Sequence, residues 1–305
     1  MTITPQQWAD AGRTRSQLRT ELASQRLVRL RRGAYLATPL PTDWQLHQLK
    51  LRATLPSLGP STYFAYTSAA VAHGLPLLAR RLGEVVVVRT GGGHGCVNPT
   101  LHARIAQLGD TETSIVDGLP VTSLARTVAD LVRTLPYDEA VMIADAGLRR
   151  GLDRDDLLAA THKGRGCRMA RRALLFADGR SESPGESLSR IRMEAAGLPA
   201  PELQQVILDR LGNFLARTDF CWEDYGIIGE FDGAVKYGRL LKPGETAADV
   251  IKAEKRREQA LIDAGWIVIR WTWDDLWNHG FESRLQRAID GRRDLLSMGI
   301  DWRLP

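Results

Sequence analysis

Cysteine is scarce in this sequence of 305 residues, which contains only Cys96, Cys167 and Cys221. The three are far apart and odd in number, which argues against a disulfide framework and against the short spacings of a zinc knuckle. The six histidines show no metal-ligand spacing either. We therefore expect a reducing, cytoplasmic setting and no structural zinc site.

Long hydrophobic runs are also missing, and none approaches the roughly 18 apolar residues that a membrane-spanning helix needs. The first residues lack the basic start and apolar stretch of a secretory signal. Hydrophobic residues make up 44% and charged residues 25% of the chain, as in soluble globular proteins. The length predicts two or three domains.

Acidic residues are few at the N-terminus, where positive charge concentrates. Residues 1–37 contain seven arginines but only Asp10 and Glu21, a net charge of +5 that equals the excess of the whole chain. The remaining residues are neutral on balance. A compact basic segment attached to a neutral body is typical of a protein that binds a polyanion through that segment.

The basic segment predicts two helices followed by a hairpin. Thr4 and Pro5 begin the first helix, a second is expected at about 14–24, and two short strands flank a turn at Arg32 and Gly33. A helix in the DNA major groove with a wing beside it is an established docking mode. The candidate DNA-binding residues are Arg15 and Arg19 on one helix face, Arg29 and Arg31 on one strand face, and Arg32 at the turn. The alternative is a solvated charged surface.

Residues 3–15 and 27–36, which end in an Arg-Gly-Ala-Tyr wing at 32–35, resemble the winged-helix domain of AbiEi-type antitoxins. The middle of the chain is similar to the region C-terminal to that domain in many relatives, at 67–70, 73–76 and 118–130. The resemblance covers about the first 175 residues. It implies autorepression of a promoter and neutralisation of a nucleotidyltransferase toxin.

Composition and pattern divide the chain into three predicted parts: a winged helix-turn-helix at 1–40, a mixed α/β linking or partner domain at 41–180, and a third domain at 181–305. The third begins with a helix at about 184–196. Three strands are expected near 202–209, 215–222 and 226–233, a long helix at 246–264, a strand at 266–273 and a last helix at 281–297. The fold class is thus α/β, with a C-terminal mixed sheet flanked by helices.

Carboxylates interrupt two of these apolar strands. Asp219 lies in one, and Glu230 and Asp232 share a face of the next, because strand side chains alternate. A tight turn at 223–225 would bring Asp219 beside Glu230. Clustered buried carboxylates repel one another and are costly to desolvate, and a divalent cation with oxygen ligands relieves both costs. The pattern predicts a site for Mg²⁺ or Mn²⁺, suited to phosphate chemistry.

This arrangement resembles the PD-(D/E)XK nuclease superfamily, in its branch related to very-short-patch repair endonucleases, over most of 183–275. The resemblance implies that Asp219 and Glu230 bind the metal and that Glu186 is an auxiliary acid. Asp232 stands where the usual catalytic lysine would be, and Lys236, four residues further on, is its candidate substitute.

Each acid also has a structural interpretation. Glu186 could complete a capping box with Ser183 or pair with Arg190, Asp219 could be exposed or salt-bridged, and Glu230 and Asp232 could face water. Gln204 and Gln205 could reach the site from the first strand. The sequence leaves two functions open: a Mg²⁺-dependent DNA endonuclease, consistent with a role in host defence, or a non-enzymatic repressor and antitoxin with an inactive nuclease fold.

Overall fold

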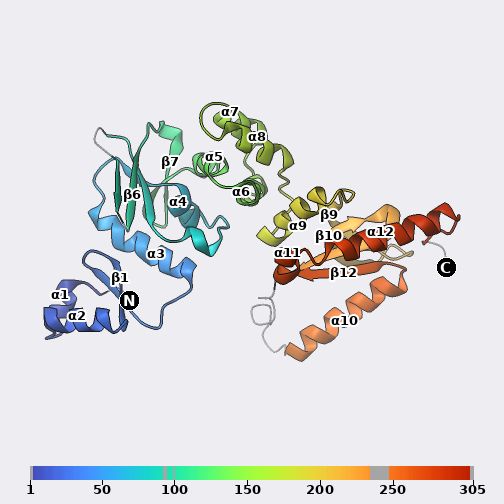
Figure 1. Ribbon diagram of the computed structural model, residues 1–305, viewed down its shortest axis with the longest axis horizontal. Helices are drawn as coiled ribbons and strands as arrows, with labels where there is room; N and C mark the ends of the chain where they lie inside the picture. Colours follow the sequence, from blue (N-terminus) through green and yellow to red (C-terminus); the bar gives the residue numbers. More distant parts are fainter. Residues whose placement is uncertain (1–2, 92–94, 99, 234–246, 303–305) are drawn as a thin grey trace. The chain divides into compact units, whose positions relative to one another are not determined.

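The computed structural model describes residues 3–91, 95–98, 100–233 and 247–302, and in it the chain forms two compact units, 1–177 and 178–305 (Figure 1). The boundary falls close to the expected start of the last domain at 181. A further division at residue 40 stays a prediction. The mixed α/β class is confirmed. Within the described part of the chain, no helix is both long and apolar enough to cross a membrane.

The first unit begins with two short helices and a hairpin. Capping boxes at Thr4 and Thr14 start the two helices, and Gly33 adopts the positive φ that the hairpin turn requires. The bounds are α1 Pro5–Asp10, α2 Arg15–Ala23, β1 Leu27–Arg31 and β2 Ala34–Ala37.

One face of the hairpin packs on α1 and α2 through Leu27 and Tyr35, and the other on α3 through Leu30 and Leu36. The polar residues 41–50 predict the beginning of a linking helix, and in the structure this helix is α3, Asp43–Thr54.

The expectation that Arg29 and Arg31 share a strand face is wrong. Arg29 pairs with Tyr35 but Arg31 pairs with Ala34, so a bulge lies between the two arginines. Tyr35 belongs to the cluster against α1 and α2, whereas Ala34 belongs to the cluster against α3. The bulge therefore sends the two arginines to opposite faces, and Arg31 donates from Nη1 to the Ala53 carbonyl at 2.9 Å.

A six-stranded mixed sheet with the order β5-β6-β4-β3-β8-β7 forms the centre of the first unit. In this part of the chain the sequence pattern predicts strands at 84–89 and 118–122 and helices at 123–135 and 137–149, and the structure contains all four. The pattern gives no clear signal for β3, β5, β6 and α7. The bounds are β3 Thr62–Phe64, α4 Tyr66–His73, β4 Val85–Arg89, β5 Cys96–Asn98, β6 Leu101–Ile105, β7 Thr113–Val116, β8 Leu119–Thr122, α5 Leu124–Thr134, α6 Tyr137–Arg149, α7 Arg154–Thr161 and α8 Cys167–Phe176.

The second unit is a four-stranded mixed sheet between helices. Its strand order is β12-β11-β10-β9, with β11 and β12 parallel and the other pairs antiparallel. A 3₁₀ turn at Glu223–Tyr225 joins β10 to β11 at the expected place. The bounds are α9 Pro184–Ala195, β9 Glu202–Leu208, β10 Phe214–Trp222, β11 Ile227–Asp232, α10 Ala247–Asp263, β12 Ile267–Thr272, α11 Trp273–Asn278 and α12 Glu282–Ser297.

Two different cores cover the faces of this sheet. Leu261 of α10 packs against Cys221 and Ile228 on one face. On the other, the buried Trp271 stacks between Phe220 and Phe281, with ring centroids 5.3 and 4.6 Å apart. Figure 1 shows α10 and α12 on either side of the strands.

The expected strand 266–273 ends one residue early, because Thr272 caps a short helix that begins at Trp273. This helix, α11, was not predicted from the sequence.

In the first unit, a histidine without solvent exposure connects α3 to the sheet. Nδ1 of His47 lies 3.1 Å from the Leu82 carbonyl oxygen, and Nε2 lies 3.1 Å from Oγ of Ser68. Since that hydroxyl also accepts from the backbone N–H of Val86, its own proton is directed to Nε2. The neutral ring with a proton on Nδ1 satisfies the whole chain of hydrogen bonds.

Burial lowers the pKa of His47 to about 4, against the opposing effect of the hydrogen bond to Leu82. Because the folded pKa lies below the unfolded value of about 6.5, the stability it contributes is complete above pH 6.5 and is lost as the pH falls toward 4. We expect the unfolding free energy of the first unit to drop by about 2–3 kcal/mol from this group between pH 7 and 4.5.

Urea unfolding of wild type and His47→Gln over this pH range isolates the contribution of His47. The variant should be less stable at pH 7 and show a shallower pH dependence. Equal slopes in the two proteins would contradict the assignment.

Candidate functional site

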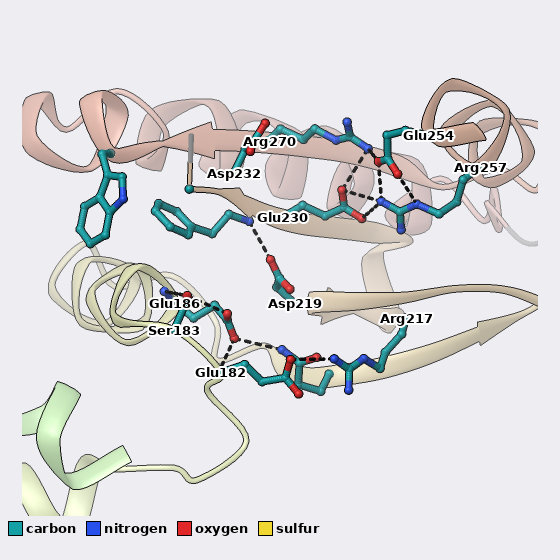
Figure 2. A pocket seen from close by; sticks show the side chains of 14 residues that line it. Glu182, Ser183, Glu186, Arg217, Asp219, Glu230, Asp232, Glu254, Arg257 and Arg270 are labelled. Atoms are coloured by element: carbon teal, nitrogen blue, oxygen red, sulfur yellow. Dashed lines mark hydrogen bonds and ion pairs between the residues drawn. The ribbon is translucent and has the colours of Figure 1, made fainter. Parts of the chain in front are cut away.

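A pocket of about 630 Å³, lined mostly by charged and polar side chains, lies in the second unit where α9, the sheet and α10 meet (Figure 2). It gathers four of the five residues proposed from the sequence as catalytic. The pocket is lined by Glu182, Ser183, Glu186, Gln204, Arg217, Asp219, Glu230, Phe231, Asp232, Gly233, Glu254, Arg257, Arg270 and Trp273.

Strand register brings Asp219 and Glu230 together, as predicted. The antiparallel pairing of β10 with β11 ends at Phe220 and Gly229, and Asp219 and Glu230 are the next residues on the two strands. Their carboxylates are directed differently, however (Figure 2). Oδ2 of Asp219 accepts from the backbone N–H of Phe231 at 2.9 Å, whereas Glu230 extends toward Arg257 and Arg270.

Two arginines hold both oxygens of the Glu230 carboxylate. Nη2 of Arg257 lies 2.8 Å from Oε1 and 3.0 Å from Oε2, and Nη2 of Arg270 lies 3.0 Å from Oε2. Arg270 is the direct neighbour of Glu230 in the parallel pair β11–β12. Glu254 on α10 bonds both arginines as well, which completes a network of two carboxylates and two guanidinium groups.

Burial dominates the electrostatics of this network. The Glu230 side chain is only 12% exposed, and desolvation raises its pKa against the attraction of Arg257 and Arg270. The pKa of the more accessible Glu254 is lowered, chiefly by its hydrogen bond with Arg257. Arginine thus offsets part of the cost of burying Glu230 in this structure, an alternative to a metal that the sequence pattern did not indicate.

Glu186 is buried near the start of α9, where it satisfies local donors. Its amide donates to Oγ of Ser183, and its carboxylate accepts from that hydroxyl at 2.7 Å and from the Glu182 amide at 2.8 Å. A third donor is Nε2 of Gln204, at 3.0 Å. Ser183 therefore caps α9 at the Glu186 amide, as half of the predicted capping box, while the Glu186 carboxylate takes its backbone donor from Glu182 instead of Ser183 and also lines the pocket.

Gln204 reaches the site from β9 through an unusual backbone. Its φ is +55°, in a region that non-glycine residues seldom adopt. The register of β9 with β10 places it opposite Asp219. Backbone strain of this kind often occurs at functional sites. The sequence gives no signal for the conformation, although it does place Gln204 on the correct strand.

Of the two remaining candidate catalytic residues, one lies in the pocket and the other lies outside the described residues. Asp232 lines the pocket at the end of β11. Lys236, the candidate catalytic lysine, lies outside the described residues. Arg217, two residues before Asp219 on β10, forms its ion pair with Glu182 at 2.7 Å.

The acids of the pocket have the negative charge that a divalent cation requires, but they are not arranged as a preformed metal site. Six carboxylates and three arginines line the pocket, a formal balance of −3. Mg²⁺ typically uses only one or two protein carboxylates, which Asp219 and Glu230 would supply. Among the described residues, no three acids, histidines or cysteines are close enough to form a metal centre. A metal at Glu230 would compete with Arg257 and Arg270 for the carboxylate oxygens.

The proposed DNA-binding arginines of the first unit have a different environment. Arg15, Arg19, Arg29 and Arg32 are exposed and form no ion pair with any described residue. Arg26, by contrast, pairs with Glu21 at 2.7 Å. Arg31, tied to Ala53, is the member of the predicted set that also has a structural role.

No protein-family model matches the chain. The chain is 30% identical over 203 residues to the uncharacterized protein Rv2248 of Mycobacterium tuberculosis strain H37Rv. It is equally similar to the uncharacterized protein MT2308 of strain CDC 1551. Each alignment covers 65% of this chain and 72% of the relative. Among solved structures, the Rv2827c protein of the same species aligns with 68% of this chain and 83% of its own, with 15% identity and a TM-score of 0.37.

Close packing of α9 on β11 positions the pocket and can be tested with two helical glycines. A Cβ on Gly185 would lie 1.9 Å from the Phe231 ring, whereas one on Gly291 of α12 would meet nothing within 4 Å. We expect Gly185→Ala to destabilise the second unit by about 2–3 kcal/mol through overpacking.

Gly291→Ala should instead stabilise the protein by up to about 1 kcal/mol, because alanine is the better helix former. Denaturant unfolding followed by tryptophan fluorescence measures both. Tolerance of Gly185→Ala without loss of stability would contradict the packing described for α9.

Proposed function

The chain belongs to the same family as the uncharacterized Mycobacterium tuberculosis protein Rv2248, and we propose that it is a DNA-binding protein whose C-terminal unit cleaves phosphodiesters with Mg²⁺ or Mn²⁺. The N-terminal α1–α2–hairpin segment, acting as a winged helix, supplies the contact with DNA. One observation carries the proposal: Asp219 and Glu230, the residues next to the last pair of β10 with β11, line one pocket together with Glu186 and Asp232.

The proposed chemistry depends on the types of group in this pocket. When bound, the metal would activate water and stabilise negative charge on the phosphate oxygens. Asp219 and Glu230 would hold it, and Glu186 or Asp232 would assist by orienting water. Arg257 and Arg270 provide positive charge at the same site, which can contribute to electrostatic stabilisation of the transition state. The excess negative charge of the pocket favours cation binding.

The second candidate function is a repressor and antitoxin that has no nuclease activity and binds a nucleotidyltransferase toxin. The observation in its favour is that Arg257 and Arg270 contact both oxygens of the Glu230 carboxylate, which gives the buried acid partners of opposite charge without a metal. Both functions use the N-terminal unit for DNA, so they differ in cleavage and not in DNA binding.

Plasmid cleavage in Mg²⁺ or Mn²⁺ separates the two functions. We expect Asp219→Asn and Glu230→Gln each to reduce cleavage at least about 100-fold, because removal of a carboxylate ligand weakens the hold on the metal. Glu182→Gln, which alters an acid of the same pocket that pairs with Arg217, is the matched control and should retain most activity. Absence of cleavage by wild-type protein in either metal would favour the repressor.

DNA binding by the first unit is tested by the salt dependence of affinity for a duplex. Arg15→Ala with Arg19→Ala removes two exposed charges of α2, and we expect weaker binding and a slope in log[salt] that is shallower by about 2. Arg26→Ala, which removes an arginine already paired with Glu21, should change the slope less. An unchanged slope in the double variant would exclude α2 from the interface.

A further inference from the structure

We propose that Arg257 and Arg270 form a phosphodiester-binding site that exchanges partners: they hold Glu230 in the free protein and release it to the metal when they bind a DNA phosphate. The inference rests on the proposed function and specifies how its site assembles. It predicts that metal and phosphodiester bind cooperatively, each raising the affinity for the other.

The two arginines are placed to bind one anion together. Arg257 and Arg270 come from different elements, α10 and β12, yet their guanidinium groups converge on the same carboxylate within one pocket (Figure 2). Guanidinium groups bind phosphate oxygens with the same donor geometry that they use for carboxylates. Nε of Arg270 is buried and has no acceptor among the described residues, so this arginine has an unused donor.

The charge balance of the site favours joint binding of metal and phosphodiester. The six acids and three arginines that line the pocket carry a formal charge of −3. A phosphodiester alone would raise this charge to −4, whereas a divalent cation first reduces it to −1, and the phosphodiester then brings it to −2. The metal therefore lowers the electrostatic cost of binding the phosphodiester, and because coupling between two ligands is reciprocal, the phosphodiester raises the affinity for the metal.

The arginines also have a second acidic partner to retain. Arg257 donates to the Glu254 carboxylate from Nε at 3.0 Å and from Nη2 at 2.7 Å, and Arg270 contacts the same carboxylate. Loss of Glu230 therefore leaves both arginines in place. Glu254 acts as a positioning residue that keeps the pair aimed at the pocket, while Glu230 is the group that changes partner.

The experiment measures Mn²⁺ binding to the full-length protein by electron paramagnetic resonance, with and without the dinucleotide dTpdT, which carries a single phosphodiester. We expect dTpdT to raise the Mn²⁺ affinity of wild type about tenfold, within the usual range for coupled sites. In Arg257→Gln with Arg270→Gln, Mn²⁺ should bind more tightly without dTpdT, because Glu230 is already released, and the dTpdT effect should be lost.

Arg217→Gln is the matched control, since it removes the same type of charge from the same pocket but pairs with Glu182. It should retain the tenfold effect of dTpdT. If the control and the double variant lose the dTpdT effect on Mn²⁺ affinity to the same extent, the effect depends only on the total charge of the pocket, and the proposed exchange is wrong. If the double variant does not fold, Arg257→Lys, expected to weaken the coupling, replaces it.

The wild-type measurement is decisive in either direction. Mn²⁺ binding that requires Asp219 but is unaffected by dTpdT would overturn the exchange while leaving the metal-dependent function in place. No Mn²⁺ binding by any variant, with or without dTpdT, would overturn the proposed function itself.

Discussion

The second unit depends on the burial of the Glu230 carboxylate within a mixed sheet. An ionised carboxylate that is only 12% exposed must have partners of opposite charge or lose its charge. Arg270, its neighbour in β12, and Arg257, on the helix that covers this face, supply them. The position of α10 and the parallel pairing of β11 with β12 are therefore linked to the same electrostatic requirement that shapes the pocket.

The opposite face of this sheet supplies rigidity. Phe231 sits between α9 and the edge of Trp273, and the indole of Trp271 stacks on Phe220 and Phe281 and donates to Ser189. The amide of Phe231 is held by Asp219. A residue of the aromatic core thus fixes one carboxylate of the pocket, whereas Glu230 depends on side chains that can change partners. The two acids that the sequence paired as equivalents are held in physically different ways.

Sequence was sufficient for the parts of this site that depend on local pattern. Alternating apolar residues and the turn at 223–225 predicted that Asp219 and Glu230 lie near each other, and the Ser183 spacing predicted the cap at the start of α9. The ion pairs of Glu230 with the arginines could not be predicted from the sequence, because Arg257 is 27 positions from Glu230 and only tertiary packing brings the two together. The bulge between Arg29 and Arg31 was missed for a related reason, since strict alternation assumes an uninterrupted strand. Short strands such as β3 and β5 offered too few residues for a pattern.

The arginines of the two units differ in their surroundings, and this difference supports the separate functions proposed for the units. In the second unit, arginines are partly buried and satisfied by acids that the fold brings to them. In the first, Arg15, Arg19, Arg29 and Arg32 are exposed without a described acidic partner, although an acid on the same helix, Glu21, pairs with Arg26. Like charges left together on a small surface repel and contribute nothing to folding. The proposed contact with DNA would account for the unpaired arginines of the first unit, whereas in the proposed exchange a phosphate would replace an acid that the pocket arginines already bind.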